Sequence, residues 1–185
     1  GSGTVPTARL GTGTADSSVF LAGDNTWAAA GGGRIGQVLN VIKTDTFTLT
    51  GNSFQDVTDL TLDITPAATS SKILWTFCTN GSSCDFGWYK VVYGDDSDLT
   101  TNSIGDAAGS RQRTASSNIN SAVHEQNATT IQGLDAPATT SATTYKVQLC
   151  GISGKTIYVN RAETDTNNSS HGRGISTFTL MEVLA

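Results

Sequence analysis

The chain has 185 residues, 15% of them charged, and a formal net charge of −5. This length predicts one main domain with room for a short additional segment. The acidic balance and the scattered Lys and Arg residues argue against nucleic acid or an anionic membrane surface as partner, and no apolar run has the length of a membrane span.

Residues 1–34 differ in composition from the rest of the chain. They are rich in Gly, Thr and Ala and show no sustained periodicity, so they cannot bury enough apolar surface to fold alone. A flexible linker is one interpretation. However, a linker does not need large apolar side chains such as Phe20, Leu21 and Trp27, whereas neighbouring copies that pack together could bury them. Gly1 and Ser2 resemble an expression scar. We therefore predict a short extended stalk over residues 1–34 and a head domain over residues 35–185.

From residue 35 onward, short strand signals replace this pattern. Runs with period-two alternation, separated by Gly, Asn and Pro, predict strands at 37–44, 46–50, 60–64, 72–79, 86–93, 129–134, 143–150, 156–159 and 175–184. Asn80-Gly81 has turn chemistry, so we expect strands 72–79 and 86–93 to pair as an antiparallel hairpin. Residues 112–125 would allow one short helix. The strand pattern predicts an all-β, antiparallel β-sandwich or jelly-roll-like head.

The sequence does not decide whether any of the three cysteines form a disulfide. Cys78 and Cys84 flank the predicted turn, where a hairpin would let them form a disulfide. The alternative, which we favour, is a pair of small buried thiols. Cys150 ends an apolar strand and is expected in the core.

The residues that carry enzyme and metal chemistry form no recognisable pattern. His124 and His171 lie in polar segments, whereas catalytic triads usually sit on well-packed elements. Most carboxylates lie in loops, and nothing in the sequence pairs two of them as a glycosidase requires. Asp95, Asp96 and Asp98 lack the spacing of a calcium loop. We therefore expect no enzymatic activity, no metal and no cofactor.

Recognition of a glycan or a protein fits the sequence better. It requires aromatic side chains beside polar groups on loops, and residues 95–120 and 161–174 are the longest polar stretches. Strand 86–93 is apolar on both faces, which indicates either a receptor site or, as we favour, a subunit interface. The same argument holds for the last strand, 175–184, because strands buried on both faces suit the inside of an oligomer. The candidate binding residues are Trp88, Tyr93, Asp95, Asp96, Asp98, Arg111, Arg113, Tyr158, His171 and Arg173.

Both ends of the chain resemble a known family. Residues 10–27 follow the pattern L-G-x-G-x-x-x-x-x-x-F-L-x-G-D-x-x-W. This pattern resembles the linkers of bacteriophage tail-fibre and phage-like structural proteins, with Asn25-Thr26 where many of those have Gly-Thr or Gly-Ser. Residues 156–161 and 172–183, which end in Met181-Glu182-Val183, are similar to the final module of many environmental phage fibre proteins. The middle of the chain matches only in general character.

The resemblance implies a homotrimeric β-structured fibre tip at the distal end of a virion tail fibre. Its partners would be its own copies, the upstream fibre shaft, and a glycan or protein of the host cell surface. Phe20, Leu21 and Trp27 would then be stalk and trimer contacts. The alternative is a purely structural virion decoration or trimerisation module that does not touch a receptor.

Overall fold

All regular structure in the described part of the chain is β-strand. The computed structural model describes residues 11–12, 19–23, 25–29, 35–83, 86–101, 103–119 and 123–184. Its named strands pair antiparallel, and these residues contain no helix, hence none that is long and apolar enough to cross a membrane. The chain divides into two units, Gly1–Arg34 and Ile35–Ala185. The predicted all-β class is confirmed.

The first unit contains a small antiparallel pair of strands. β1 (Val19–Leu21) pairs with β2 (Trp27–Ala29), so that Leu21 lies opposite Trp27. Asn25, in the turn between them, has a left-handed backbone with φ of 62°, a conformation that Asn tolerates better than most residues. The stalk and trimer roles of Leu21 and Trp27 stay predictions, and the side chain of Phe20 lies outside the described residues.

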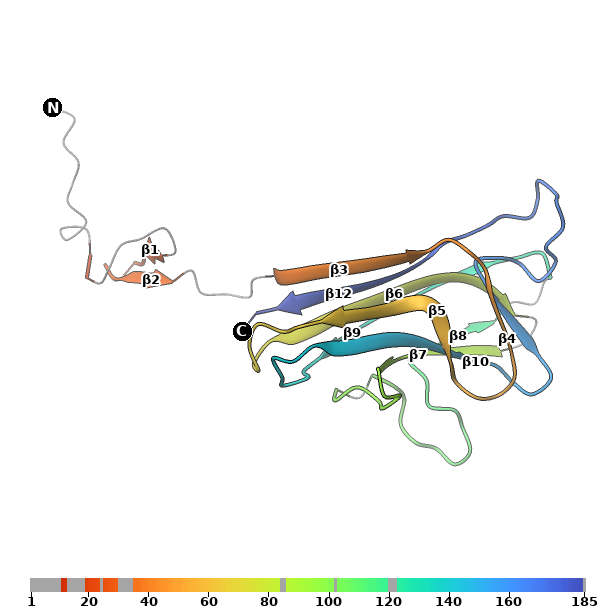
Figure 1. Cartoon of the computed structure of the whole chain (residues 1–185), viewed down its shortest axis with the longest axis horizontal. Coiled ribbons are helices and arrows are strands. Elements are labelled where there is room, and N and C mark those ends of the chain that lie inside the picture. Colours follow the sequence, from red (N-terminus) through yellow and green to blue (C-terminus); the bar gives the residue numbers. More distant parts are fainter. Residues whose placement is uncertain are drawn as a thin grey trace. The chain divides into compact units, whose positions relative to one another are not determined.

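The second unit, which we call the head, consists of two sheets in a sandwich-like arrangement (Figure 1). The larger sheet contains β3 (Ile35–Lys43), β4 (Phe47–Thr50), β6 (Lys72–Ser83), β9 (Asn127–Asp135), β11 (Thr156–Val159) and β12 (Ser176–Val183). The smaller sheet has the strand order β5 (Gln55–Ile64), β10 (Thr143–Cys150), β7 (Phe86–Tyr93) and β8 (Ser116–Ile119).

Strand β6 organises the larger sheet, and its course shows that the predicted 72–79/86–93 hairpin is wrong. β6 runs through Asn80 and Gly81 without turning, and Gly81 lies between Asn127 of β9 and Val159 of β11. A Cβ at Gly81 would meet the carbonyl oxygen of Tyr158, so this glycine permits a close strand approach instead of a turn. β7 pairs in the other sheet, with β10 and β8.

The structure also bears on two smaller predictions, the short helix and the environment of the cysteines. The described residues of the range 112–125 form no helix, because Ser116–Ile119 pairs with the edge of β7 as β8. Cys150 is fully buried, as expected. Cys84 lies outside the described residues, so the Cys78–Cys84 question stays open; Cys78 itself is half-buried and faces outward from β6.

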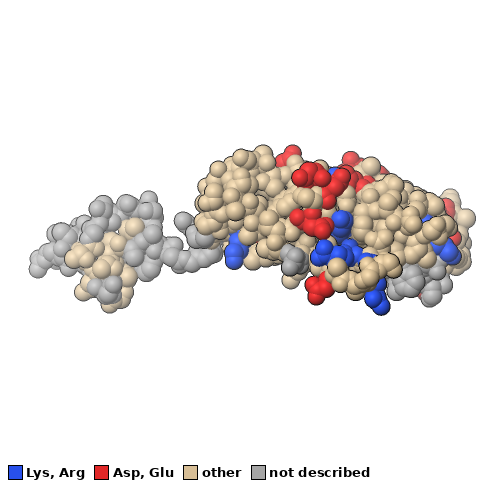
Figure 2. All heavy atoms as spheres, turned by 90° about the horizontal axis from the view of Figure 1, so that it is seen from below, with Lys and Arg blue, Asp and Glu red and all other residues tan. Residues whose placement is uncertain are grey.

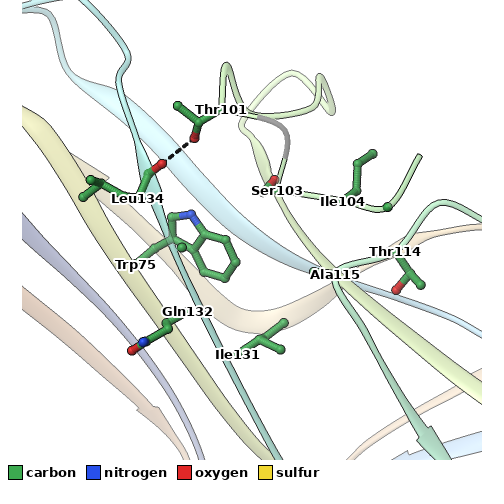
Figure 3. A pocket seen from close by; sticks show the side chains of 11 residues that line it. Trp75, Thr101, Ser103, Ile104, Thr114, Ala115, Ile131, Gln132 and Leu134 are labelled. Carbon is green, nitrogen blue, oxygen red and sulfur yellow. Dashed lines mark hydrogen bonds between the residues drawn. The ribbon is translucent and has the colours of Figure 1, made fainter. Parts of the chain in front are cut away.

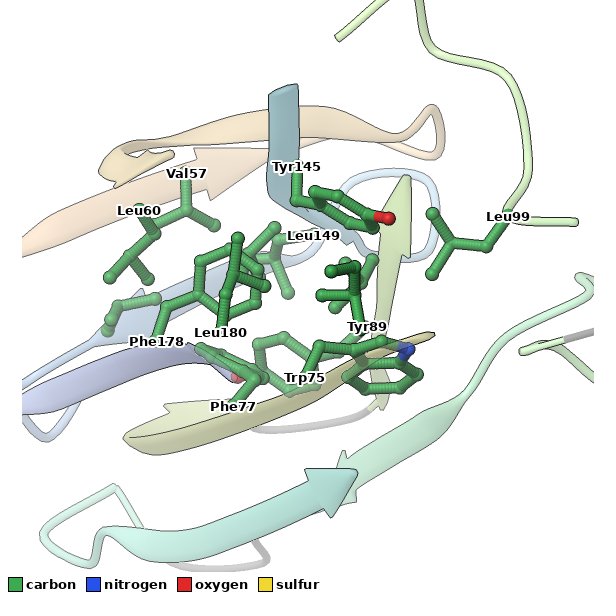
Figure 4. Packing of buried hydrophobic residues seen from close by; sticks show 14 of the residues in the cluster. Val57, Leu60, Trp75, Phe77, Tyr89, Leu99, Tyr145, Leu149, Phe178 and Leu180 are labelled. Carbon is green, nitrogen blue, oxygen red and sulfur yellow. The ribbon is translucent and has the colours of Figure 1, made fainter. Parts of the chain in front are cut away.

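The core between the sheets follows from strict alternation along the strands. In β12 the residues that face the other sheet are buried and the intervening ones are half-exposed, along the whole strand. The aromatic rings of Phe77 and Tyr89 meet across the sheets with centroids 5.5 Å apart. Figure 4 shows this layer, with Leu99 entering from outside the strands towards Tyr145.

A buried carboxylate ties the two sheets together where β9 ends. Asp135 is fully buried and accepts hydrogen bonds from the hydroxyls of Tyr93 on β7 at 2.5 Å and Tyr145 on β10 at 2.7 Å. The hydroxyl of Thr100 adds a third bond at 2.7 Å. Burial by itself raises the pKa of Asp135, but the three hydroxyl donors outweigh it and hold this pKa below its ordinary value. Burial and the carboxylate raise the pKa of Tyr145.

This network predicts a specific loss of stability in acid. A carboxyl whose pKa is lower in the folded state stabilises the fold above its unfolded pKa, and that contribution disappears as the pH falls below about 4. We expect Asp135→Asn to lower the free energy of unfolding at pH 7 by about 1–3 kcal/mol and to flatten its decline in acid. Urea denaturation between neutral pH and strong acid measures both effects. Asp106→Asn, at an exposed position, is the control; an unchanged acid slope in Asp135→Asn would contradict the assignment.

Candidate binding site

The 94–115 segment, which joins β7 to β8, is anchored to the sandwich in its first half and at its far end. Leu99 and Ile104 are buried, and Thr100 binds the buried Asp135. The segment's far end is held where the amide of Ala115 donates to the carbonyl of Tyr89 at 2.9 Å. A long connection anchored in this way is an ordered surface, which is unusual unless it has a role of its own.

Between this segment and strand β9 lies a cavity of about 470 Å³ (Figure 3). Trp75 of β6 and Ile131 of β9 line it on the sandwich side, and Ile104 and Thr114 line it from the 94–115 segment. The hydroxyl of Thr101 donates to a β9 carbonyl, which links the segment to the strand at one end of the cavity. None of the described residues that line the cavity is charged.

Two buried polar atoms at this cavity have no hydrogen-bond partner among the described residues. They are the indole Nε1 of Trp75 and the hydroxyl of Ser103. Trp75 is only 2% exposed, and buried polar groups normally have a partner. The predicted site residues include neither of them, because alternation along strand 72–79 marks Trp75 as core. Only the position of Ser103 in the long polar stretch 95–120 points to it in the sequence.

Gly133 provides the space that the Trp75 ring occupies. It lies directly opposite Trp75 in the register of β6 and β9, and a Cβ at position 133 would overlap the indole. Gly105, which also lines the cavity, has no such neighbour, since the nearest atom to its Cβ position is 3.8 Å away.

These two glycines give a matched test of the cavity geometry. We expect Gly133→Ala to lower the free energy of unfolding by about 1–3 kcal/mol, because the indole must move or its strand must shift. Gly105→Ala should change it little. Chemical denaturation monitored by tryptophan fluorescence measures both, and equal effects of the two substitutions would show that the indole does not occupy this position.

The predicted acidic residues of the segment are engaged in ion pairs on the outer face of the smaller sheet. Lys146 of β10 lies 2.6 Å from Asp96 and 2.8 Å from Asp56 of β5. Lys90 of β7 contacts Asp98 at 3.2 Å. In Figure 2, acidic and basic side chains lie side by side in the middle of the head. The hydrogen bonds that Lys146 donates to Asp56 and Asp96 raise the pKa of Lys146. The charges on this face are therefore paired with one another.

The other predicted residues of this region are bound to the protein itself. The hydroxyl of Tyr93 binds Asp135, Asp95 accepts a hydrogen bond from the hydroxyl of Ser97, and Trp88 is half-buried on β7. Arg111 and Arg113 donate to main-chain carbonyls of their own segment. None of these predicted residues lines the cavity.

The remaining predicted residues form a second group around the 161–174 loop. Asp165 pairs with Arg173 at 2.6 Å and with Arg161 at 3.1 Å. The guanidinium of Arg161 lies 4.3 Å from the ring centroid of Tyr158. Asp165, His171 and Arg173 also line a smaller cavity of about 300 Å³. The structure therefore brings Tyr158 and Arg173 together through Arg161 and Asp165, away from the first cavity.

The two histidines, far apart in sequence, meet beside this loop. Nε2 of His171 lies 3.1 Å from Nδ1 of His124, and the two rings are nearly parallel. The hydroxyl of Thr166 lies 3.0 Å from the other ring nitrogen of His171. Within the described residues, no group of three or more His, Cys, Asp or Glu side chains is placed to hold a metal ion.

No protein-family model matches the chain, and no curated protein matches its sequence.

Proposed function

We propose that the protein is the non-enzymatic, receptor-binding head of a phage tail fibre, at the distal tip of the virion fibre. It binds a glycan or protein of the host cell surface during adsorption. The cavity under the 94–115 segment supports this proposal, because two buried polar atoms beside it have no partner among the described residues. A purely structural module gains nothing from such a space, whereas a binding site uses it.

The fibre context explains how a small cavity serves attachment. Copies held together on one shaft present several sites at once, so that weak single contacts combine into strong binding. Residues 1–34, which resemble fibre linkers, would connect the head to the upstream shaft. Leu21 and Trp27, brought opposite each other in the first unit, would contact neighbouring copies there.

The outer face of the larger sheet favours association between copies, which the structural alternative also requires. Val38, Met181, Leu74 and Leu134 lie in register across β3, β12, β6 and β9. They form an apolar row across the sheet, whose two ends are well exposed: 56% for Val38 and 42% for Leu134. An apolar row of this kind indicates a protein contact.

The contrast with the other sheet strengthens this assignment. The next row on the same face is also uncharged: Asn40, Thr179, Thr76 and Gln132. The outer face of the smaller sheet carries Lys146, Lys90 and their carboxylate partners. There Val92 is fully buried and bridges to Asp98 of the chain's own segment. Of the two strands to which the sequence analysis assigned a subunit interface, the last strand, through Met181, therefore offers the better surface for a second copy than strand 86–93.

Oligomeric state tests this part of the proposal. We expect light scattering on a size-exclusion column to give three times 19.2 kDa, as a trimer requires. Leu74→Lys should shift the protein towards monomer, because it places a charge at the centre of the apolar row. Ala142→Lys, at an exposed position off this face, should leave the mass unchanged. A wild-type monomer would contradict the oligomeric proposal.

Adsorption tests the attachment function directly. The purified protein should label host cells and slow adsorption of the phage that carries it, in proportion to concentration. Ala115→Trp, which fills the cavity, should reduce both effects while the variant keeps the wild-type oligomeric mass. If the wild-type protein labels no host cell and blocks no adsorption, the structural alternative is the better assignment.

A further inference from the structure

We propose that the cavity between the 94–115 segment and β9 binds one ring of a neutral sugar, with Trp75 and Ser103 as its hydrogen-bonding residues. This inference rests on the proposed attachment function and names the class of ligand that the head takes. It follows from three properties of the cavity: its size and charge, its unpartnered polar atoms and its apolar walls.

The size and charge of the cavity exclude several ligand classes. At about 470 Å³, it is within the range of small-molecule sites. No described lining residue is charged, so a carboxylate, sulfate or phosphate would lose its water without gaining a cationic partner. Acidic sugars and phosphate-bearing headgroups are therefore disfavoured, and a neutral ligand remains.

The two unpartnered atoms define what the ligand must offer. The indole Nε1–H of Trp75 is a donor only, so it requires an acceptor. The hydroxyl of Ser103 both donates and accepts. A sugar hydroxyl meets both requirements. An aliphatic ligand would leave the Trp75 donor buried and unsatisfied, which is costly.

The remaining walls suit the apolar side of a sugar ring. Ile104 and Ile131 approach from opposite sides of the cavity, with the indole of Trp75 between the strands beneath (Figure 3). A pyranose presents C–H groups on its faces and hydroxyls around its edge, so one molecule can contact the apolar walls and bind the polar atoms together. This combination favours a sugar over a lipid chain, which matches only the walls.

The indole N–H of Trp75 supplies a direct readout in the full chain. The NMR spectrum of ¹⁵N-labelled protein shows the indole N–H signals of three tryptophans, and Trp75→Phe identifies the signal of Trp75 by its loss. We expect glucose, galactose or N-acetylglucosamine to move this signal in a saturable titration. Glucuronic acid, which has the glucose ring with a carboxylate in place of its CH₂OH group, should not move this signal.

A matched pair of serine variants separates binding from folding. Ser103→Ala should weaken sugar affinity three- to tenfold, roughly one lost hydrogen bond, and leave the melting temperature unchanged because its hydroxyl has no partner in the described chain. Ser110→Ala, at an exposed position of the same segment outside the cavity, should change neither.

The outcomes distinguish this inference from the attachment function. If none of the neutral sugars moves the Trp75 signal while the wild-type protein still labels host cells, the ligand class is wrong and attachment stands. Glucuronic acid moving the signal as strongly as glucose overturns the exclusion of charged ligands. If the sugars bind but the protein neither labels cells nor blocks adsorption, the attachment function is wrong and the sugar site stands.

Discussion

The carboxylate of Asp135 is the constraint on which the head depends most. A buried carboxylate is tolerated only when hydrogen-bond donors replace its lost water. Asp135 belongs to the larger sheet, and its donors come from the smaller sheet, Tyr93 and Tyr145, and from the 94–115 segment, Thr100. One group thus fixes how the sheets meet and where the segment leaves the sandwich. The cavity exists because the segment is held there, a few residues before Ser103.

At the end of the sandwich opposite Asp135, a buried cation also links the two sheets. Lys43 of β3, whose side chain is fully buried, reaches Asp45 at 2.8 Å and Asp59 near the middle of β5 at 3.4 Å. Asp59 has a left-handed backbone with φ of 65°, and the register of β5 against β10 shifts beside it. The irregular part of β5 is therefore held by a charge from the opposite sheet. Both links join segments that are distant in sequence.

The two outer faces of the sandwich serve different purposes. The smaller sheet is covered by ion pairs and by the chain's own segment, so its exposed surface is polar and satisfied. The larger sheet keeps the apolar row through Leu74 and Met181 on its outer face, beside the uncharged row through Thr76 and Thr179. In the proposed function, the apolar row meets other copies and the cavity meets the host.

Strand positions were largely predictable, because alternation of apolar and polar residues is a local property. The strands at 86–93, 143–150 and 156–159 were predicted with the observed bounds, and the other predicted strands differ mainly at their ends. β8 was missed because its sequence, Ser116–Ile119, is polar and becomes a strand only by pairing with β7. The turn predicted at Asn80-Gly81 was wrong for the opposite reason. These residues prefer a turn locally, but pairing with two neighbouring strands keeps them extended.

The sequence by itself therefore determined the all-β class, the positions of most strands and which side chains face inward in the strands that alternate clearly. Only the tertiary structure decided which strands pair and what the inward residues meet. Trp75 shows the difference: period two correctly places it inside, but it lines a cavity only because Gly133 and the 94–115 segment lie opposite. Such a site depends on contacts between residues far apart in the chain, and no local pattern encodes them.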